Sequence, residues 1–433
     1  MMAFVPNGGP KKCNFGCLGF GECVKACPFD AIHIKNGVAV VDKEQCKACG
    51  KCIKACPKNL IELVPYDAKH AVQCSSQDKG KQVMTACKVG CIGCKMCERV
   101  CESGAVTVEN NIAHIDQTKC TGCGACASGC PKGAIQMVRD REGFLYPQIG
   151  DGCVSCGHCA HVCPVLKQRE VRDRPAAFAA WNADEAVRAC STAGGVFTAL
   201  ARYVLEGGGV VFGAALDEKL QVRHIAVKDP EELRLLRGAK PIQSELGETF
   251  QQVQRYLEQG RAVLFVGAPC QVDGLYRFLG EHPEKLLTCD FVCGGVGSPG
   301  VWARFVDSMT YVKRRPAVDV HFCDKQKGEK QRRFRVWFQG GGTFDAPLSR
   351  CQPGRGIMRR LFLRPCCYHC AYTNTNRPGD LTMGLYTGLP KEFYAQEQRG
   401  GVSVLLVNTV KGAHIFDQLP LKRERRTLEE AVA

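Results

Sequence analysis

Twenty cysteines in the first 163 residues form five groups of four, and their spacing limits how this part of the chain can fold. Four of the groups read C-x2-C-x2-C-x3-C, and proline follows the last cysteine in four of the five. Because thiols so close in sequence converge in space, we expect short loops folded around a bound group. We number the groups motif one to motif five: Cys13, Cys17, Cys23 and Cys27; Cys46, Cys49, Cys52 and Cys56; Cys91, Cys94, Cys97 and Cys101; Cys120, Cys123, Cys126 and Cys130; Cys153, Cys156, Cys159 and Cys163.

The spacing and the composition both favour iron–sulfur clusters over zinc or disulfides. In this pattern three close cysteines hold one [4Fe–4S] cluster, and the fourth reaches the cluster of a partner motif. Zinc ribbons use two separated C-x2-C pairs instead. The chain begins without the apolar core of a signal peptide, so we expect a reducing, cytoplasmic location, where 31 cysteines indicate metal or redox chemistry.

The cysteine-rich half contains an internal repeat. A shift of 74 residues superimposes motif two on motif four and most of motif one on motif three. The segments "AIHIKNGVAVVDKEQC" and "AVTVENNIAHIDQTKC" then align, and each predicts a hairpin, because Asn-Gly and Asn-Asn tolerate positive φ. This half therefore holds two copies of one ferredoxin-like unit, and the second copy has a spare cysteine, Cys87 or Cys94.

Motif four has two candidate partners. Duplication pairs it with motif three. The alternative pairs it with motif five across a longer hairpin, since 22 residues separate Cys130 from Cys153 where the repeats have 18. Motif three then completes its own cluster with Cys87. The sequence leaves both pairings open.

Cysteine density also divides the chain, because 22 of the 31 cysteines precede residue 165. We predict a ferredoxin-like module with two clusters at residues 1–75, a second module with the extra fifth motif at 76–166, and a different domain at 167–433.

Charge and hydropathy exclude some partners. No apolar run of about 18 residues indicates a membrane span, although peripheral association stays open. The net charge of +15 is scattered, apart from "LKRERR" near the end, and no nucleic-acid-binding signature accompanies it. We therefore expect no nucleic acid partner, and a basic surface that attracts an acidic redox protein.

Residues 13–138 resemble the ferredoxin part of the B subunit of Rnf electron-transport complexes. The resemblance lies in "CNFGCLGFGECVKACPFDAI", "VQCSSQDKGKQVMTACKVGCIGCKMCERVC" and "CTGCGACASGCPKGAI". The membrane-anchoring N-terminal helix of that family has no counterpart here, so we expect no attachment through it.

Residues 118–433 resemble the beta-subunit family of coenzyme F-420 hydrogenases and dehydrogenases. The matching motifs are a "GF-YP" segment between motifs four and five, "STAGGVFTALARYVLEGGGVVFGAAL", "LRGAKPIQS", "VLFVGAPCQVDGL", "CDFVCGGVGSP" and "RPCCYHCAYTNTNRPGDLTMG". The two resemblances overlap on motif four, as if two chains had been joined there.

The C-terminal half alternates strand and helix patterns. "RAVLFVGAPCQVDGLYRFLG" predicts a buried strand, a turn and a helix, and "KLLTCDFVCGG" predicts another strand ending in a cysteine. "STAGGVFTALARYVLE" predicts a helix start, which is a candidate phosphate site. The expected fold is α+β ferredoxin-like cluster modules followed by an α/β flavin-binding domain, with sites at strand C-termini.

Four cysteines from three predicted turns form a candidate sixth cluster site, which the resemblance supports, with Cys366 as an adjacent competitor. They are Cys270, Cys293, Cys367 and Cys370. Cys190, Cys289, Cys323 and Cys351 have no motif and are expected to be core thiols. The expected content is thus five or six clusters.

The family resemblance also implies FAD. It places the FAD phosphates near Ser191, Gly194, Gly195 and Thr198, and adds Lys240, Gln243 and Ser244 from "RGAKPIQS". It assigns no catalytic residue.

We therefore predict an iron–sulfur flavoprotein oxidoreductase. It passes single electrons between a ferredoxin-like partner and a flavin, which exchanges two electrons with a soluble carrier such as the deazaflavin coenzyme. The alternative is a non-catalytic ferredoxin-type relay or adaptor with a degenerate flavin domain.

Three segments depart from the family pattern. "GAPC" replaces Gly-Thr-Pro-Cys, "CGGVG" replaces Cys-His-Gly-Val-Pro, and "LYTG" replaces Asp-Phe-Trp-Gly. The chain also ends at "LEEAVA", where family members commonly continue, so a C-terminal truncation is expected. From these departures we predict that the chain still binds FAD but recognises the deazaflavin weakly or not at all.

Overall fold

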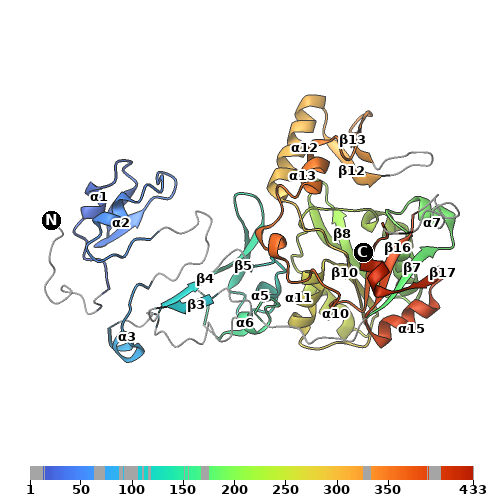
Figure 1. Cartoon of the computed structure of the whole chain (residues 1–433), viewed down its shortest axis with the longest axis horizontal. Coiled ribbons are helices and arrows are strands. Elements are labelled where there is room, and N and C mark those ends of the chain that lie inside the picture. Colours follow the sequence, from blue (N-terminus) through green and yellow to red (C-terminus); the bar gives the residue numbers. More distant parts are fainter. Residues whose placement is uncertain are drawn as a thin grey trace. The chain divides into compact units, whose positions relative to one another are not determined.

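The chain folds into two compact units, one of Met1–Lys119 with Val165–Gln168 and one of Cys120–Pro164 with Arg169–Ala433 (Figure 1). The computed structural model describes residues 13, 15–62, 74–86, 91, 106–109, 112–115, 119–150, 152–154, 156–166, 175–324, 333–387, 389 and 401–432. The second unit thus begins at Cys120 and includes motifs four and five, whereas the sequence placed the boundary at residues 166 and 167.

The first unit contains two of the predicted hairpins. Strands β1 (Ile32–Lys35) and β2 (Val38–Val41) pair antiparallel around Asn36 and Gly37, which have φ of 51° and 73°. Two successive positive φ values are what a two-residue hairpin turn requires. Short helices α1 (Glu22–Lys25) and α2 (Lys51–Ala55) contact each other beside this hairpin.

The second repeat contributes helix α3 (Gly80–Ala86) and a second antiparallel hairpin. Its strands are β3 (Val106–Glu109) and β4 (Ile112–Ile115), as the sequence predicted. Of the cysteines of motif three, the described residues include Cys91. Cys94, Cys97 and Cys101 lie outside the described residues, as does Cys87.

Motifs four and five flank a longer hairpin at the start of the second unit. Its strands are β5 (Ile135–Arg139) and β6 (Leu145–Ile149), which pair antiparallel. Helix α5 (Ala125–Ser128) precedes the hairpin, and helix α6 (His158–His161) follows it. The two helices contact each other, so the hairpin returns motif five to motif four.

An eight-stranded mixed sheet forms the centre of the second unit. The strand order is β17-β7-β16-β15-β11-β10-β8-β9, and β8, β10, β11 and β15 run parallel to one another. The strands are β7 (Ala176–Asn182), β8 (Val210–Leu216), β9 (Val222–Val227), β10 (Val263–Gly267), β11 (Leu286–Phe291), β15 (Leu381–Leu385), β16 (Ser403–Val407) and β17 (Leu421–Arg426). All five residues of β10 are buried, as expected of a parallel strand covered on both faces.

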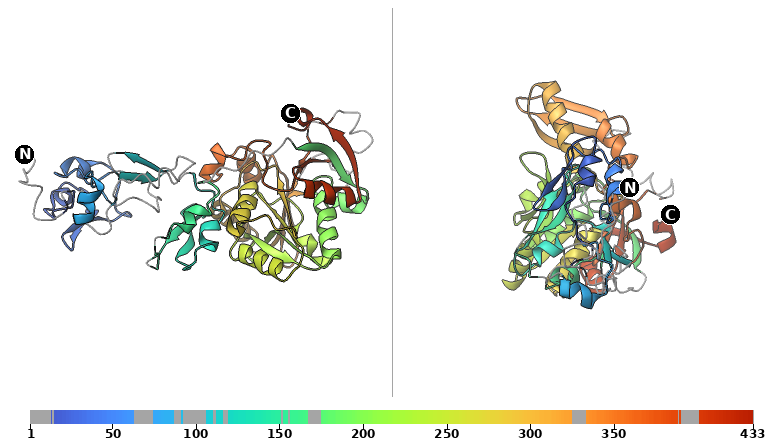
Figure 2. Two further views of the ribbon diagram at one scale, coloured as in Figure 1. Left: turned by 90° about the horizontal axis from the view of Figure 1, so that it is seen from below. Right: turned by 90° about the vertical axis from the view of Figure 1, so that its left-hand side faces the viewer.

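Helices cover both faces of this sheet (Figure 2). Leu264 and Val266 of β10 face a core that includes α8 (Val196–Glu206) and α15 (Val410–Gln418). The alternate residues of β10, Val263 and Phe265, face a second core with α10 (Thr249–Glu258) and α11 (Pro269–Leu279). The remaining helices are α7 (Glu185–Ala189), η3 (Pro230–Glu232), α9 (Leu233–Leu236) and α16 (Leu428–Val432). None of the helices in the described ranges is long and apolar enough to cross a membrane.

The second core continues into the cluster motifs. Cys123, Ala125 and Val162 belong to the same buried group as Phe250 and Leu275. A Cβ atom on Gly274 of α11 would lie 3.1 Å from the Cys123 Sγ. This close packing of α5 against α11 is why motifs four and five belong to the second unit.

A small sheet that the sequence did not predict lies between residues 299 and 358. Helix α12 (Pro299–Lys313) packs on strands β12 (Ala317–Asp324), β13 (Arg333–Phe338) and β14 (Thr343–Pro347). Helix α13 (Gln352–Met358) and the 3-10 turn η4 (Pro365–His369) follow it.

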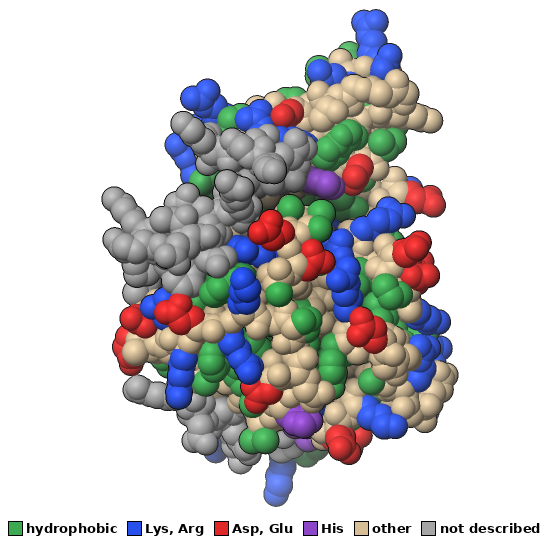
Figure 3. Space-filling view, turned by 90° about the vertical axis from the view of Figure 1, so that its right-hand side faces the viewer, with side chains coloured by type: hydrophobic (Ala, Val, Ile, Leu, Met, Phe, Trp, Pro, Cys, Tyr) green, Lys and Arg blue, Asp and Glu red, His purple; other side chains and the backbone are tan. Residues whose placement is uncertain are grey.

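The basic cluster "LKRERR" is the whole of edge strand β17. Its Arg423 pairs with Asp417 at 2.7 Å, and Arg426 pairs with Glu424 at 2.7 Å. On the face that Figure 3 shows, basic and acidic side chains are interspersed. Charged residues on an edge strand discourage pairing with another strand, so the cluster has a structural explanation.

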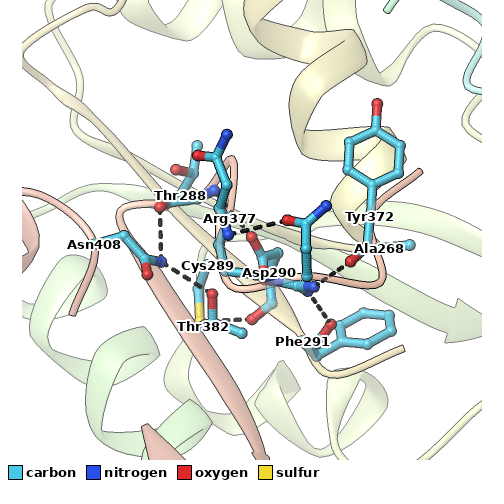
Figure 4. A network of polar contacts seen from close by, with 12 residues as sticks. Ala268, Thr288, Cys289, Asp290, Phe291, Tyr372, Arg377, Thr382 and Asn408 are labelled. Atoms are coloured by element: carbon cyan, nitrogen blue, oxygen red, sulfur yellow. Dashed lines mark hydrogen bonds and ion pairs between the residues drawn. The ribbon is translucent and has the colours of Figure 1, made fainter. Parts of the chain in front are cut away.

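A buried ion pair links β11 to the loop before β15 (Figure 4). The Arg377 guanidinium donates two hydrogen bonds to Asp290 Oδ1, at 3.1 and 2.8 Å. Gly379 N donates to Asp290 Oδ2 at 2.9 Å, and Asp290 is fully buried. A carboxylate in this position stabilises the fold only while its partners remain.

We expect Asp290→Asn to lower the unfolding free energy of the second unit by about 3–5 kcal/mol, because Arg377 would then be a buried, uncompensated charge. Urea unfolding followed by tryptophan fluorescence measures this. Trp181, Trp302 and Trp337 are the chain's three tryptophans, and all lie in this unit.

Asp417→Asn is the matched control for this prediction. It removes an equally short ion pair with Arg423, but Asp417 is 69% exposed, so we expect a loss below about 1 kcal/mol. Equal losses in the two variants would contradict the stated role of the Asp290 ion pair.

Candidate iron–sulfur and cofactor sites

Motifs one and two exchange their fourth cysteines. Burial raises the pKa of the Cys23 thiol, and the neighbouring Cys17 and Cys56 raise it further. Burial also raises the pKa of Cys52, and the neighbouring Cys46 and Cys27 raise it further. Each group of thiols thus combines close cysteines of one motif with the last cysteine of the other, which is the arrangement of a two-cluster ferredoxin.

Two cavities coincide with these mixed groups. One of about 70 Å³ is lined by Cys27, Cys46, Cys49 and Cys52 together with apolar side chains such as Ile32. Another of about 30 Å³ is lined by Cys17, Cys23 and Cys56 with residues that include Leu18 and Ile34. Soft thiols in an apolar lining suit an iron–sulfur cluster.

Backbone amides point at the sulfurs in a pattern that repeats. Leu60 N donates to Cys56 Sγ at 3.3 Å, and Ala134 N donates to Cys130 Sγ at 3.3 Å. The two pairs are related by the 74-residue shift. Hydrogen bonds from several backbone amides lower the pKa of the Cys130 thiol. Such donors stabilise a thiolate, which is the form that binds metal.

Motif four receives its fourth thiol from motif five. Burial raises the pKa of Cys123 to about 12, and Cys163 adds to the increase. Burial raises the pKa of Cys126 as well, and Cys120, Cys163 and Cys159 are among the neighbours that add to it. Among the described residues, motif four is thus combined with the last cysteine of motif five, which is one of the two pairings that the sequence left open. Cys94, Cys97 and Cys101 of motif three lie outside the described residues.

The four C-terminal cysteines converge from three segments. Burial raises the pKa of Cys270, in the first turn of α11, and Cys293, Cys123, Cys367 and Cys370 raise it further. Cys293 follows β11, and the last two cysteines lie in and just after η4. The C-terminal set therefore lies beside Cys123 of motif four.

Cys366 is close to this set but is oriented toward its neighbour. The Cys366 and Cys367 thiols are hydrogen-bonded to each other. The Arg364 side chain also interacts with Cys366.

The cysteines without a motif differ in burial. Cys289 and Cys351 are buried in apolar cores, as predicted. Cys190, however, is exposed at the end of α7, and Cys323 is half-buried in β12, so neither is a full core thiol. Cys190 lies at the end of a short helix and Cys323 lies in an edge strand, so both side chains are partly open to water.

The described residues do not gather three Cys, His, Asp or Glu side chains closely enough to hold a single metal ion. Ligands of one zinc ion lie about 2.3 Å from the metal, and a four-iron cluster holds its thiolates farther apart. The donor chemistry of the thiol groups, their apolar linings and their amide donors fit clusters of that kind.

The residues that the resemblance connects with FAD phosphates lie at the start of α8. Gly195 has φ of 78° and caps the helix, and Thr198 is buried in its first turn. Gly194 packs so closely that a Cβ would lie 2.4 Å from Ala180 O. Its N–H donates to Ser403 Oγ at 2.9 Å, and Ser191 Oγ donates to Val187 O at 2.7 Å.

Lys240 is connected to the start of α8 by hydrogen bonds that involve Arg237. Arg237 Nε donates to Thr198 Oγ1 at 3.2 Å, and Lys240 Nζ donates to Arg237 O at 2.7 Å. Burial lowers the pKa of Lys240 to about 8, since desolvation disfavours its ammonium form. Thr198 and Lys240 thus both contact Arg237, Thr198 at its guanidinium and Lys240 at its backbone carbonyl.

Gln243 and Ser244 make different contacts. Gln243 Oε1 accepts a hydrogen bond from Arg364 Nη1 at 3.0 Å, and Ser244 Oγ accepts one from Gln271 Nε2 at 2.9 Å. Both side chains are buried. Sequence reasoning missed Arg364, because a lone arginine before a proline gives no signal of burial.

We expect Cys163→Ala to remove the same cluster signal as Cys123→Ala, with a loss of about four irons per chain, because Cys163 completes the motif-four thiol group. Electron paramagnetic resonance and iron analysis of the full chain measure both effects. Cys190→Ala, at an exposed cysteine outside the motifs, should leave the signals unchanged. Loss of that signal in Cys101→Ala but not in Cys163→Ala would support the pairing with motif three instead.

Models of known protein families match most of the chain. Residues 177–250 and 260–431 match the N-terminal and C-terminal domains of the coenzyme F420 hydrogenase/dehydrogenase beta subunit. Residues 90–134 and 113–170 match 4Fe-4S dicluster domains, which overlap on motif four. Residues 13–67 match an LdpA Fe-S cluster-binding domain.

Curated relatives match the cysteine-rich half. The B subunit of the ion-translocating oxidoreductase complex of Methanosarcina acetivorans is 49% identical over 110 residues, which is 25% of this chain and 42% of the relative. The B subunit of the proton-translocating ferredoxin:NAD(+) oxidoreductase complex of Clostridium ljungdahlii is 46% identical over 112 residues, or 26% of this chain and 39% of the relative. The chain thus spans about two fifths of the length of these relatives.

Among solved structures, a chain of the F420-reducing [NiFe] hydrogenase complex from Methanosarcina barkeri aligns with 60% of this chain and 84% of its own length, at 18% identity and a TM-score of 0.41. The family matches, rather than this overlay, identify the C-terminal domains. The chain is therefore of iron–sulfur oxidoreductase type, and it belongs to the coenzyme F420 hydrogenase/dehydrogenase beta-subunit family over residues 177–250 and 260–431, behind a ferredoxin part similar to that of the Rnf B subunits.

Proposed function

We propose that this chain carries single electrons from a ferredoxin-like redox protein, through clusters bound by motifs four and five and by the C-terminal cysteines, to a flavin. The observation that carries the proposal is the position of Cys123 beside Cys270. It brings the motif-four thiol group and the C-terminal thiol group into one packed core.

The burial of the cysteines supports a direction from the surface inward. Cys153 and Cys156 of motif five are exposed, whereas Cys123 of motif four is buried. An external donor can approach motif five, and motif four then leads toward the C-terminal group. Motifs one to three supply further clusters in the first unit.

The start of α8 is the part of the chain that supports FAD binding. Its helix N-terminus presents backbone amides, and Arg237, whose backbone carbonyl accepts a hydrogen bond from Lys240, places its guanidinium on Thr198. A bound flavin supplies the exchange between single electrons and a two-electron carrier, for which the deazaflavin coenzyme is the candidate. Ser191, Gly194, Gly195 and Thr198 would hold its phosphates, with Lys240, Gln243 and Ser244 in supporting positions.

The cysteine content supports a reducing location. The described cysteines are all free thiols, and we propose a cytoplasmic protein that works with other redox proteins.

The non-catalytic relay remains the second candidate, and one observation favours it. The Gly194 N–H, the Ser191 hydroxyl and the side chains of Gln243 and Ser244 already have hydrogen-bond partners within the protein. A domain that has lost its flavin would be expected to satisfy these groups internally.

We expect the full chain, purified without oxygen, to contain roughly 20–24 irons and a similar amount of labile sulfide, because five or six clusters hold about four irons each. Iron, zinc and sulfide analyses measure this content. Stoichiometric zinc with little sulfide would rule out the cluster assignment.

We also expect bound FAD that dithionite or reduced ferredoxin bleaches through the clusters, whereas the reduced deazaflavin bleaches it slowly or not at all. The reason is that the helix start at α8 is retained, while "GAPC", "CGGVG" and "LYTG" depart from the family. Stopped-flow absorbance with each donor measures the rates. Fast bleaching by the deazaflavin would contradict lost recognition, and a protein without flavin would favour the relay.

A further inference from the structure

Arg364 is a fully buried arginine directly before η4, and its environment lacks an acidic partner. Its relative exposure is 0%, and the described groups that interact most strongly with its charge are Cys120, Tyr146 and Cys366, none of which is a carboxylate. A guanidinium stays charged under all relevant conditions. Burial of a charge without a counter-charge is strongly unfavourable, so an anion is expected beside it.

The guanidinium is directed at motif four. Its Nε donates to Cys120 O at 2.9 Å, and one Nη lies 3.8 Å from Cys120 Sγ. The remaining donors reach Leu145 O at 3.0 Å and Gln243 Oε1 at 3.0 Å. All of these oxygen acceptors are neutral, so the Cys120 sulfur is the hydrogen-bond acceptor of this guanidinium that can become anionic.

Packing holds the guanidinium in this position. It lies over the Tyr146 ring at 4.1 Å and near the Phe144 ring at 5.6 Å. Gly122, with φ of 68°, leaves no room for a side chain beside the guanidinium, since a Cβ there would be 2.7 Å from Nη1. The motif-four loop therefore rests directly on the guanidinium.

The equivalent cysteine of the first repeat has a different donor. Cys46 aligns with Cys120 under the 74-residue shift, and the recorded hydrogen bond to its Sγ comes from Ala48 N at 3.4 Å. A neutral amide stabilises added negative charge less than a guanidinium does. The two repeat positions thus differ by one positive charge.

We propose that Arg364 is a positioning residue that raises the reduction potential of the cluster bound by motif four above the value that the motif alone would give. The inference rests on the proposed function, because it requires a cluster at Cys120, Cys123, Cys126 and Cys163. In the reaction one electron passes from a reduced ferredoxin-class donor to this cluster, and no bond is made or broken. The cluster gains one negative charge, which the guanidinium stabilises.

The position of Arg364 indicates what a raised reduction potential of the motif-four cluster would do. Arg364 lies between Cys120 and the cysteines of η4, which belong to the C-terminal thiol group. A higher potential at motif four draws electrons from motif five into the core. It therefore favours electron transfer from motif five to motif four.

The test is a redox titration of the full chain, followed by electron paramagnetic resonance, in which the signal absent from Cys123→Ala identifies the motif-four cluster. Gln243→Glu is the sharpest variant, because it places a carboxylate on Arg364 with almost no change in shape. We expect the equilibrium to shift at least tenfold toward the oxidised cluster. For a one-electron couple this lowers the reduction potential by about 59 mV. Arg364→Lys should lower the potential in the same direction, since an ammonium cannot make the same fork of bonds.

Arg335→Gln is the matched control, because Arg335 is also buried but lies in β13 and pairs with Asp345. It should leave the potential of the motif-four cluster unchanged. An unchanged potential in both Gln243→Glu and Arg364→Lys, with the cluster present, would overturn the inference. Absence of this cluster from the unmodified chain would instead overturn the proposed function on which it rests.

Discussion

The packing of the motif-four loop against the C-terminal domain is the interaction on which the second unit depends. Cys123 lies against Gly274 of α11, and Arg364 reaches across from η4 to hold Cys120. Apolar burial and a buried cation thus act on the same short loop. Because of this contact, the cluster motif is part of the α/β core, and the C-terminal cysteines lie within its reach.

Features set by local chemistry could be predicted from the sequence. Asn36 and Gly37 adopt the positive φ values that their hairpin requires, and the apolar run at 263–267 forms a strand covered on both faces. The convergence of the C-terminal cysteines was also predictable. Residues that follow the parallel strands β10 and β11 meet at one edge of the sheet, where η4 brings the last two cysteines.

Features that depend on distant contacts could not be predicted in this way. The pairing of motif four was ambiguous, because its repeat relationship favours motif three while the packing of α5 favours α6. The dicluster family matches overlap on motif four in the same way. The burial of Arg364 and the Asp290 pair with Arg377 follow from loops that meet only in the folded chain. Residues 317–347 contain no sequence motif that would have predicted their three-stranded sheet.

We propose that the motif-four cluster and the C-terminal cluster are neighbours in one electron path. The most direct measurement is the magnetic interaction between them in the fully reduced full chain, read from the line shape and relaxation of the electron paramagnetic resonance signals. We expect the motif-four signal to be broadened by a neighbouring spin, and we expect Cys293→Ala, which would remove a ligand of the C-terminal cluster, to sharpen it. A motif-four signal that is the same in both proteins, with both clusters shown to be present in the unmodified chain, would contradict the path.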